Sequence, residues 1–201
     1  MADRLVVFID YQNVYKGARD AFFTQNSASQ EGQIHPKALA RRIEIGRNSF
    51  APSELKEVRV YRGMPDGRRD SKGYSASSRQ TARWERSGIT VKNRPLKYPP
   101  GWPEVKAQEK GVDVQLAIDY VAMAINDEYD VGVLVSCDTD LRPALEVVMS
   151  LGKKVEVAAW RGSNGRSPRL TLPPPANVWC HWMDIETYGH CSDPTDYGKP
   201  I

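Results

Sequence analysis

The chain has 201 residues, 40% of them hydrophobic, and a formal net charge of +3. This length favours one compact domain and leaves too little chain for two well-packed cores. The longest apolar runs, Leu5–Ile9 and Val131–Val135, are far shorter than the ~20 residues of a membrane-spanning helix, so we expect no membrane insertion.

The predicted elements alternate between strands and helices. Strand candidates are short β-branched runs bounded by polar or turn residues, and helix candidates carry apolar residues on one face. In chain order they are strand Leu5–Ile9, helix Asn13–Phe23, helix Pro36–Arg47, strand Val58–Tyr61, helix Ser71–Ser87, strand Ile89–Val91, helix Val112–Ile125, strand Val131–Ser136, helix Leu141–Leu151 and strand Val155–Ala159. This alternation predicts an α/β fold, a three-layer sandwich around a mostly parallel central sheet.

Three polar or Pro-rich stretches are predicted to be irregular: 24–35, 92–105 and 161–176. We expect residues 1–160 to form the domain and residues 161–201 to form an extension packed on it. The Gly, Pro and Asp residues after Tyr188 predict a frayed tail.

The expected location is the cytoplasm. The N-terminal residues lead directly into an apolar strand and lack the segment of a secretory signal. The three cysteines, Cys137, Cys180 and Cys191, are odd in number, which disfavours a disulfide framework.

The charges are unevenly distributed along the chain. Residues 59–110 contain thirteen Lys and Arg against five Asp and Glu, whereas residues 111–160 contain three against nine. The first segment would attract a polyanion, and the second would repel it unless a cation sat among the carboxylates. This combination suggests a metal-dependent enzyme acting on nucleic acid. The alternative is that both segments form ordinary solvated surfaces.

Acidic residues follow two of the predicted strands. Asp10 ends the first strand, and Asp138 and Asp140 follow the strand that ends at Ser136. Asp113 lies in the first turn of the helix before that strand. Ligands of parallel α/β sheets bind outside the carboxyl ends of the strands, so these acids are candidates for one site.

Such a cluster of carboxylates has two interpretations. Carboxylates held together repel one another unless a cation is present, and their hard oxygen atoms suit Mg²⁺ or Mn²⁺. An ion of this kind supports phosphodiester hydrolysis by activating water and stabilising developing negative charge. Alternatively, each Asp caps a helix or stabilises a turn.

Three ordered motifs resemble those of NYN domains. They are Val-Val-Phe-Ile-Asp10-Tyr-Gln-Asn13, then Lys110-Gly-Val-Asp113-Val-Gln-Leu-Ala-Ile-Asp119, and then Val-Leu-Val-Ser136-Cys-Asp138-Thr-Asp140-Leu-Arg-Pro143. The similarity extends from about Arg4 to Trp160, most of the chain. Each motif is weak alone, but their order and spacing make the resemblance specific.

The resemblance implies a PIN-like fold and divalent-metal nuclease activity, usually on RNA. It implies that the metal ligands are Asp10, Asp113, Asp138 and Asp140, and that these residues and Asn13 form the catalytic set. Asn13 would orient water, a ligand or a carboxylate, and Asp119 and Ser136 would have supporting roles. The chain departs from the pattern at Cys137, where Gly is usual, and at Leu141, where Phe is common. Cys137 adds a thiol that is open to oxidation or to a softer metal.

The basic segment predicts a nucleic-acid surface. Its candidate contacts are Arg62, Arg68, Arg69, Lys72, Arg79, Arg83 and Lys110. Trp84, Tyr98 and Trp102 are candidates for stacking on single-stranded bases. The alternative is that Trp84 belongs to the core and the arginines pair with acids.

The preferred hypothesis is a metal-dependent endoribonuclease that hydrolyses single-stranded RNA. One alternative is an RNA-binding regulatory module with the same fold and little or no catalytic activity. A haloacid-dehalogenase-type phosphatase would need a second Asp where Gln12 stands. Cys180-His181 and His190-Cys191 contain zinc-ligand types, but their spacing matches no standard zinc finger. The sequence leaves a homodimer open.

Overall fold

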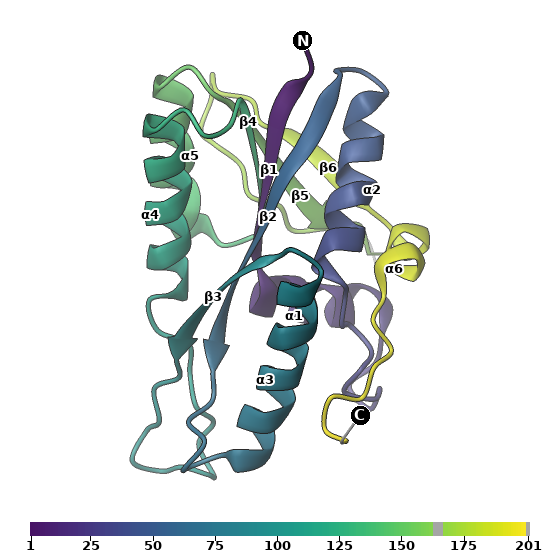
Figure 1. The fold of residues 1–201 in the computed structure, drawn as a ribbon, viewed down its shortest axis with the longest axis vertical. Helices are drawn as coiled ribbons and strands as arrows, with labels where there is room; N and C mark the ends of the chain where they lie inside the picture. The colour runs from purple at the N-terminus through teal and green to yellow at the C-terminus, as the bar shows by residue number, and fades with distance from the viewer. Residues whose placement is uncertain (163–166, 200–201) are drawn as a thin grey trace.

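A computed structural model describes residues 1–162 and 167–199 of the chain (Figure 1). One sheet contains six strands in the order β3-β2-β1-β4-β5-β6, and every ladder in it is parallel. The strands are β1 (Asp3–Asp10), β2 (Ser53–Met64), β3 (Thr90–Pro95), β4 (Val131–Val135), β5 (Lys154–Trp160) and β6 (Trp179–Met183). The predicted α/β fold is confirmed, and the sheet is entirely parallel.

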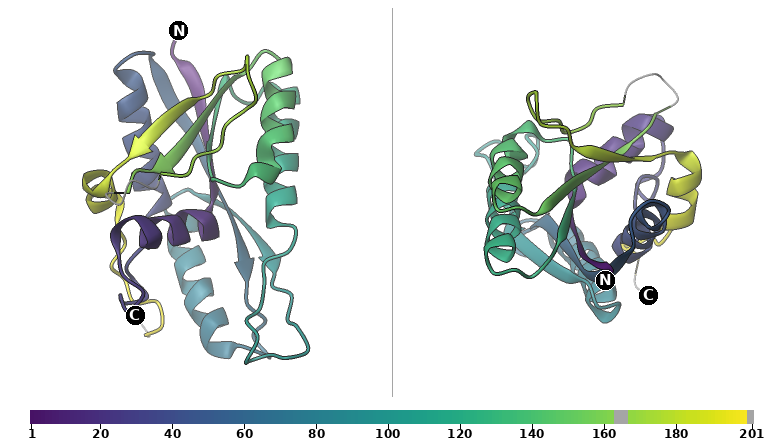
Figure 2. Two further views of the ribbon diagram at one scale, coloured as in Figure 1. Left: turned by 180° about the vertical axis from the view of Figure 1, so that it is seen from behind. Right: turned by 90° about the horizontal axis from the view of Figure 1, so that it is seen from above.

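Helices cover both faces of this sheet. Figure 2 shows α4 and α5 against one face, with α1, α2, α3 and α6 on the other, and η1 packs on the side of α4 and α5. The helices are α1 (Tyr11–Phe22), α2 (Pro36–Asn48), α3 (Ser71–Arg86), α4 (Val112–Ile125), the short 3₁₀ helix η1 (Thr139–Leu141), α5 (Arg142–Ser150) and α6 (Ile185–Cys191). Within the described ranges, no helix is long and apolar enough to cross a membrane.

Strand β1 lies at the centre and contributes to both cores. Leu5, Val7 and Ile9 pack in one apolar cluster, and Val6 and Phe8 pack in the other. A parallel strand buried on both faces needs a continuous apolar run, which is why this segment was visible in the sequence. Burial of each of these side chains contributes roughly 1.5–3 kcal/mol to folding.

The C-terminal segment is more ordered than its composition predicted. Strand β6 extends the sheet beyond residue 160, and α6 packs beside α2. Asp193 and Tyr197 are buried, and the Tyr197 hydroxyl donates a hydrogen bond to Asp193 at 2.7 Å. This buried polar pair holds the chain as far as Tyr197, within the stretch for which a frayed end was predicted, and Gly198 and Lys199 beyond it are exposed. Residues 200–201, and 163–166 of the predicted irregular stretch, lie outside the described residues.

Strand β3 begins before the stretch 92–105 and runs into it. It extends to Pro95, so the first part of that stretch is regular and not irregular as predicted. The following loop is held by a bridge between Lys97 and Gln108.

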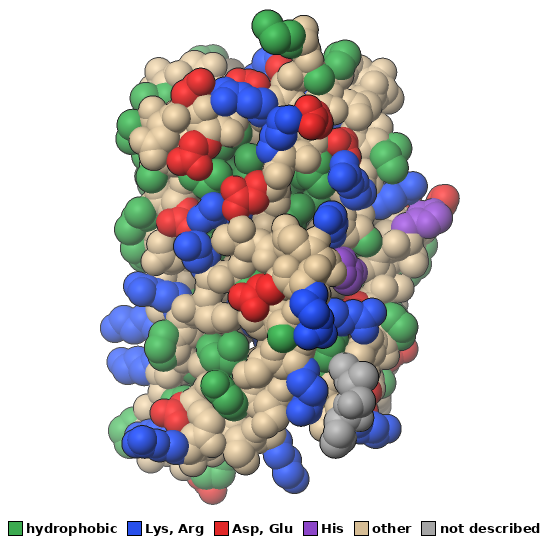
Figure 3. Space-filling view, viewed as in Figure 1, with side chains coloured by type: hydrophobic (Ala, Val, Ile, Leu, Met, Phe, Trp, Pro, Cys, Tyr) green, Lys and Arg blue, Asp and Glu red, His purple; other side chains and the backbone are tan. Residues whose placement is uncertain are grey.

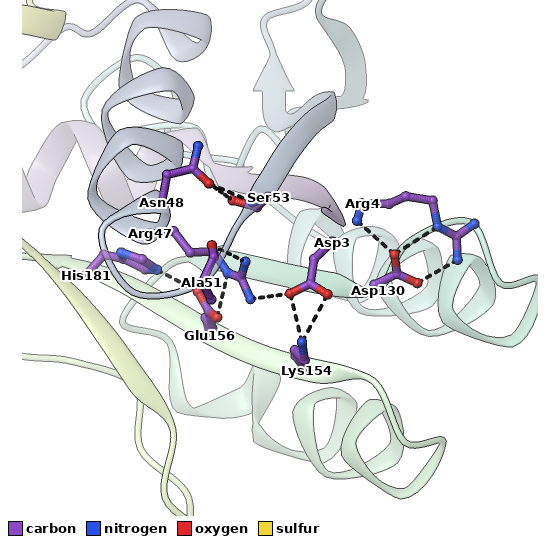
Figure 4. A network of polar contacts seen from close by, with 10 residues as sticks. All are labelled: Asp3, Arg4, Arg47, Asn48, Ala51, Ser53, Asp130, Lys154, Glu156 and His181. Carbon is purple, nitrogen blue, oxygen red and sulfur yellow. Dashed lines mark hydrogen bonds and ion pairs between the residues drawn. The ribbon is translucent and has the colours of Figure 1, made fainter. Parts of the chain in front are cut away.

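A buried ionic network fixes the amino end of the sheet (Figure 4). Arg47 is 1% exposed and donates hydrogen bonds to Glu156 at 2.9 Å and to Asp3 at 2.8 Å. His181 from β6 lies 2.7 Å from the other oxygen of Glu156. The network joins β1, β5, β6 and α2 at the edge opposite the acidic residues.

Candidate active site

The first acidic residue is fixed where β1 passes into α1. Asp10 caps α1, because its Oδ1 accepts a hydrogen bond from the Asn13 N–H at 3.2 Å. The Ser136 hydroxyl donates to its Oδ2, also at 3.2 Å. The side chain is buried, with 9% of the residue exposed. Asp10 therefore caps α1 and at the same time lies at the carboxyl edge of the sheet.

The end of β4 is bound to the same place. The Asp138 N–H donates a hydrogen bond to Ser136 Oγ at 3.1 Å. The Cys137 N–H donates to Asn13 Oδ1 at 3.0 Å. These bonds join the loop after β4 to the first turn of α1.

A cavity of about 270 Å³ lies outside the carboxyl ends of β1 and β4. Its lining includes four carboxylates, together with polar and apolar residues from α1 and α4. The lining residues are Asp10, Gln12, Asn13, Lys16, Glu109, Val112, Asp113 and Asp138. The structure thus brings together Asp10, Asn13, Asp113 and Asp138, which the sequence had placed in one site.

Glu109 and Lys16 were missed by the sequence analysis. The Gly63 N–H donates a hydrogen bond to Glu109 Oε1 at 2.5 Å. A Cβ atom at Gly63 would lie 2.7 Å from Glu109 Cγ, so glycine is needed for this approach. The available signal was the position of Glu109 directly before Lys110-Gly111. Lys16 lies one helical turn after Asn13, and it donates to Gln12 Oε1 at 2.9 Å.

The carboxylates of the cavity are electrostatically strained. The pKa of Asp10 is raised to about 6, mainly by burial and in part by the negative charges of Glu109 and Asp138, against the lowering effect of the hydrogen bonds from Asn13 and Ser136. Burial also raises the pKa of Glu109, with a further contribution from Asp113. A cation in the cavity would relieve this repulsion.

The donor set fits a hard divalent cation. Every candidate ligand is a carboxylate or amide oxygen, as Mg²⁺ and Mn²⁺ prefer. Within residues 1–162 and 167–199, no three Asp, Glu, His or Cys side chains converge closely enough to form a ready-made metal site. Mg²⁺ commonly retains several waters and uses one or two carboxylates, so it does not need such convergence.

Two predicted site residues lie away from the cavity lining. Asp140 is exposed in η1, and its N–H donates a hydrogen bond to Asp138 Oδ1 at 3.0 Å. Asp119 accepts hydrogen bonds from Arg59 at 3.1 Å and from the Tyr61 hydroxyl at 3.0 Å. Asp140 therefore contacts the site through its backbone, and Asp119 pairs with strand β2.

Part of the predicted nucleic-acid surface is exposed. Arg68, Arg69, Lys72 and Lys110 lie in or beside the loops beyond the carboxyl ends of β2 and β3. Figure 3 shows more Lys and Arg than Asp and Glu side chains over the lower half of the view. The Arg69 guanidinium lies 5.3 Å from the centre of the Tyr98 ring. Tyr98 in turn packs edge-on against Trp102, with ring centres 4.9 Å apart.

Other members of the predicted surface are structural. Trp84 is fully buried, so it belongs to the core and is not a stacking platform. Arg79 donates to the carbonyl oxygen of Tyr197 at 2.9 Å, and Arg83 donates to Thr195 at 2.8 Å. Both arginines hold the C-terminal segment. Arg62 is enclosed between the Tyr11 and Trp84 rings.

The cysteine residues form no common site. Cys180 and Cys191 lie in different apolar clusters, which argues against a zinc site that contains both. The Cys137 thiol donates to the Pro168 carbonyl oxygen at 3.0 Å. Burial raises the pKa of Cys137 to about 11, so the less reactive neutral thiol predominates at pH 7.

Comparisons with known proteins identify the family and a similar fold. Residues 4–171 match the NYN domain family. The fold is similar to the crystal structure of a protein of unknown function from Vibrio parahaemolyticus, with a TM-score of 0.51 and 19% sequence identity. That similarity covers 78% of this chain and 81% of the other. A comparison with curated proteins found no match. The chain belongs to the NYN domain family of the PIN-like nuclease superfamily.

Proposed function

We propose that this protein is a divalent-metal-dependent endoribonuclease that hydrolyses phosphodiester bonds of single-stranded RNA. One observation carries the proposal: Asp10, Glu109, Asp113 and Asp138 line one cavity at the carboxyl edge of the sheet. The pKa of Asp10 is raised mainly by burial, with contributions from Glu109 and Asp138, so its charged form is costly without a cation. Membership of a nuclease family supports phosphodiester chemistry at this cavity.

The residues of the cavity would hold and surround Mg²⁺ or Mn²⁺. When bound, such an ion lowers the pKa of water and stabilises negative charge on phosphate oxygens. Asp10, Asp113, Asp138 and Glu109 would provide the negative charge that retains it. Ser136 and Asn13 keep the ends of β1 and β4 in register. Lys16, whose side chain also lines the cavity, offers a positive charge to the substrate phosphate.

The exposed basic residues support RNA as the substrate. Arg68, Arg69, Lys72 and Lys110 lie at the same end of the molecule as the carboxylates, so they can attract a polyanion towards the cavity. Tyr98 and Trp102 lie beside Arg69 and provide aromatic surface. Stacking on unpaired bases favours single-stranded RNA over a duplex.

A second candidate function is RNA binding without cleavage. The position of Asp140 outside the cavity lining favours it. The two functions share the basic surface and differ in whether the carboxylates act on the bound strand.

Cleavage of an end-labelled, mixed-sequence single-stranded RNA distinguishes the two functions. We expect cutting with Mg²⁺ or Mn²⁺, no cutting in EDTA, and a loss of at least a hundredfold in Asp138→Asn. The matched control is Glu146→Gln, an exposed acid on α5 away from the cavity. Binding without cutting under all metal conditions would replace the nuclease proposal with the RNA-binding module.

A further inference from the structure

A second pocket adjoins the acidic cavity and contains Arg62. Its volume is about 290 Å³, and it shares Gln12 and Glu109 with the cavity. The rest of its lining comes from β2, α1 and α3 and from the loops that contain Ser29, Gln33, Pro65 and Leu96. The lining residues that carry side-chain hydrogen-bonding groups are Tyr11, Gln12, Tyr15, Ser29, Gln33, Arg62, Ser77, Gln80 and Glu109. Glu109 is the only acid among them, and it lies at the shared end.

Arg62 forms no salt bridge in the part of the chain that the structure describes, and the opposite charge that acts on it, Glu109 at the shared end of the pocket, is not in ion-pair contact. Its Nη1 donates to Gln80 Oε1 at 2.6 Å, and its Nη2 donates to Ser77 Oγ at 3.2 Å. Its Nε is buried and has no hydrogen-bond partner. An enclosed guanidinium with neutral partners and an unsatisfied N–H is costly, which is unusual for a purely structural arginine.

The guanidinium is nevertheless held in one place. It lies 5.3 Å from the centres of both the Tyr11 and Trp84 rings. Gln80 accepts from Arg62 and donates 3.0 Å hydrogen bonds to the Tyr11 hydroxyl and to Gln33 Oε1. A rigid cation at the wall of an open pocket is arranged to receive an anion at little entropic cost. The planar guanidinium matches the geometry of phosphate oxygens.

We propose that this pocket binds a phosphate group of the RNA strand, one linkage away from the bond that is cleaved. Arg62 contacts a non-bridging oxygen, and Gln12 and Gln33 line the space for the attached ribose. The subsite rests on the proposed nuclease function. It would set the register of the strand in the acidic cavity and is distinct from the exposed surface around Arg69.

A scan with neutral linkages tests the subsite. A short single-stranded RNA with one mapped cleavage position is prepared with a methylphosphonate at one linkage at a time. In the wild-type protein we expect one linkage near the cleaved bond where neutralisation lowers kcat/KM about tenfold. In Arg62→Gln, the methylphosphonate at that linkage should lower kcat/KM hardly at all. An identical scan for the wild-type protein and the variant would overturn the proposal.

Two further variants separate charge from structure. Arg62→Lys keeps the positive charge but loses the planar fork, so we expect part of the effect at the same linkage to return. Arg86→Gln removes an exposed arginine at the carboxyl end of α3, outside the pocket lining, and should leave the position of the sensitive linkage and the size of its effect unchanged. Thermal melts establish whether each variant is folded. If Arg62→Gln does not fold, a wild-type scan without a sensitive linkage contradicts the subsite.

A pair of shortened RNAs tests whether the bound phosphate is an internal diester or the end of a chain. An RNA shortened to end at the sensitive linkage is compared with a terminal phosphate and with a terminal hydroxyl. If the terminal phosphate restores kcat/KM relative to the terminal hydroxyl, the pocket also accepts the end of a chain. If kcat/KM is not restored, the pocket accepts only an internal phosphodiester. If the protein does not cleave RNA, the same oligonucleotides are used in binding measurements in EDTA. A position-specific loss of affinity there supports the subsite even though the nuclease proposal has failed.

Discussion

Ser136 Oγ donates a hydrogen bond to Asp10 Oδ2 at 3.2 Å, and this Ser136 oxygen also accepts a hydrogen bond from the Asp138 N–H at 3.1 Å. One hydroxyl therefore positions two carboxylates that come from different strands. We predict that Ser136→Ala lowers metal-dependent cleavage about tenfold and destabilises the fold by about 1–3 kcal/mol, because it leaves a buried N–H unsatisfied. Cleavage rates and urea denaturation measure both effects. Ser136→Thr keeps the hydroxyl and is the matched control, and equal losses in the two variants would contradict this role.

Asp10 is predicted to destabilise the metal-free protein. Its pKa is about 6 in the folded state, against an ordinary value of 3.8, so the folded state binds more protons between these values. Stability is therefore highest below pH 3.8, as far as this group is concerned, and is lost as the pH rises to 6. Asp10→Asn should raise the stability of the metal-free protein at pH 8 by about 3 kcal/mol at most, and the gain should shrink towards pH 4.

Thermal melts in EDTA at pH 4, 6 and 8 measure this gain. Asn at position 10 can still accept the Asn13 N–H, so the cap of α1 is retained. Addition of Mg²⁺ should stabilise the wild-type protein and not the variant. A variant that is less stable than wild type at pH 8 without metal would show that the cost of burying the Asp10 charge is outweighed by the contacts that the carboxylate makes.

Metal affinity is predicted to depend on pH in the same range. Below pH 6 a proton on Asp10 competes with the ion, and above pH 6 the free carboxylate is available. Titration with Mn²⁺, followed by electron paramagnetic resonance, should show affinity that increases as the pH rises from 5 to 7. Affinity that is the same at both pH values would remove Asp10 from the ligand set.

Glu109 and Asp140 should differ in their effect on cleavage. Glu109 lines the cavity and Asp140 does not, so we expect Glu109→Gln to lower the rate at least tenfold and Asp140→Asn to have the smaller effect. The matched control is Glu104→Gln, an exposed acid in the same loop as Glu109. A larger loss in Asp140→Asn would show that η1 rearranges to bring Asp140 into the site when metal binds.

Arg47 is predicted to affect stability and not chemistry. Removing its side chain leaves Glu156 and Asp3 without their buried cation, so Arg47→Ala should cost about 3–5 kcal/mol in the free energy of unfolding. Lys56→Ala, at an exposed ion pair with Glu54 on β2, should cost about 1 kcal/mol or less. Urea denaturation compares the two, and any loss of cleavage in Arg47→Ala should follow the fraction unfolded.

The sequence predicted the fold well where local pattern determines it. Strands β1 and β4 are buried on both faces, so their continuous apolar runs were visible in the sequence. Strand β6 was missed because its His181 is polar and is buried only through a partner in β5. No local pattern encodes that pairing.

The site was predicted in part, for a similar reason. Asp10, Asp113 and Asp138 follow from strand ends and motif order. Glu109 was missed because its place depends on a hydrogen bond from Gly63, 46 residues earlier in the chain. A basic cluster in the sequence likewise cannot distinguish an exposed arginine from Arg62, which is enclosed by rings from α1 and α3.

The position of β1 in the middle of the sheet has a consequence for synthesis of the protein. Leu5 pairs with Leu55 on one side and with Val131 on the other. Strand β1 is therefore synthesised before both of the strands that flank it, and its second edge is paired only after β4 has been made. Arg4 can form its hydrogen bonds with Asp130 only when that residue, 126 positions later in the chain, has been synthesised. Until β4 leaves the ribosome, the nascent chain carries an apolar strand with one unpaired edge, a template for aggregation. Fragments that stop before β4 are expected to be insoluble, and folding of the whole chain is expected to be slow for its size.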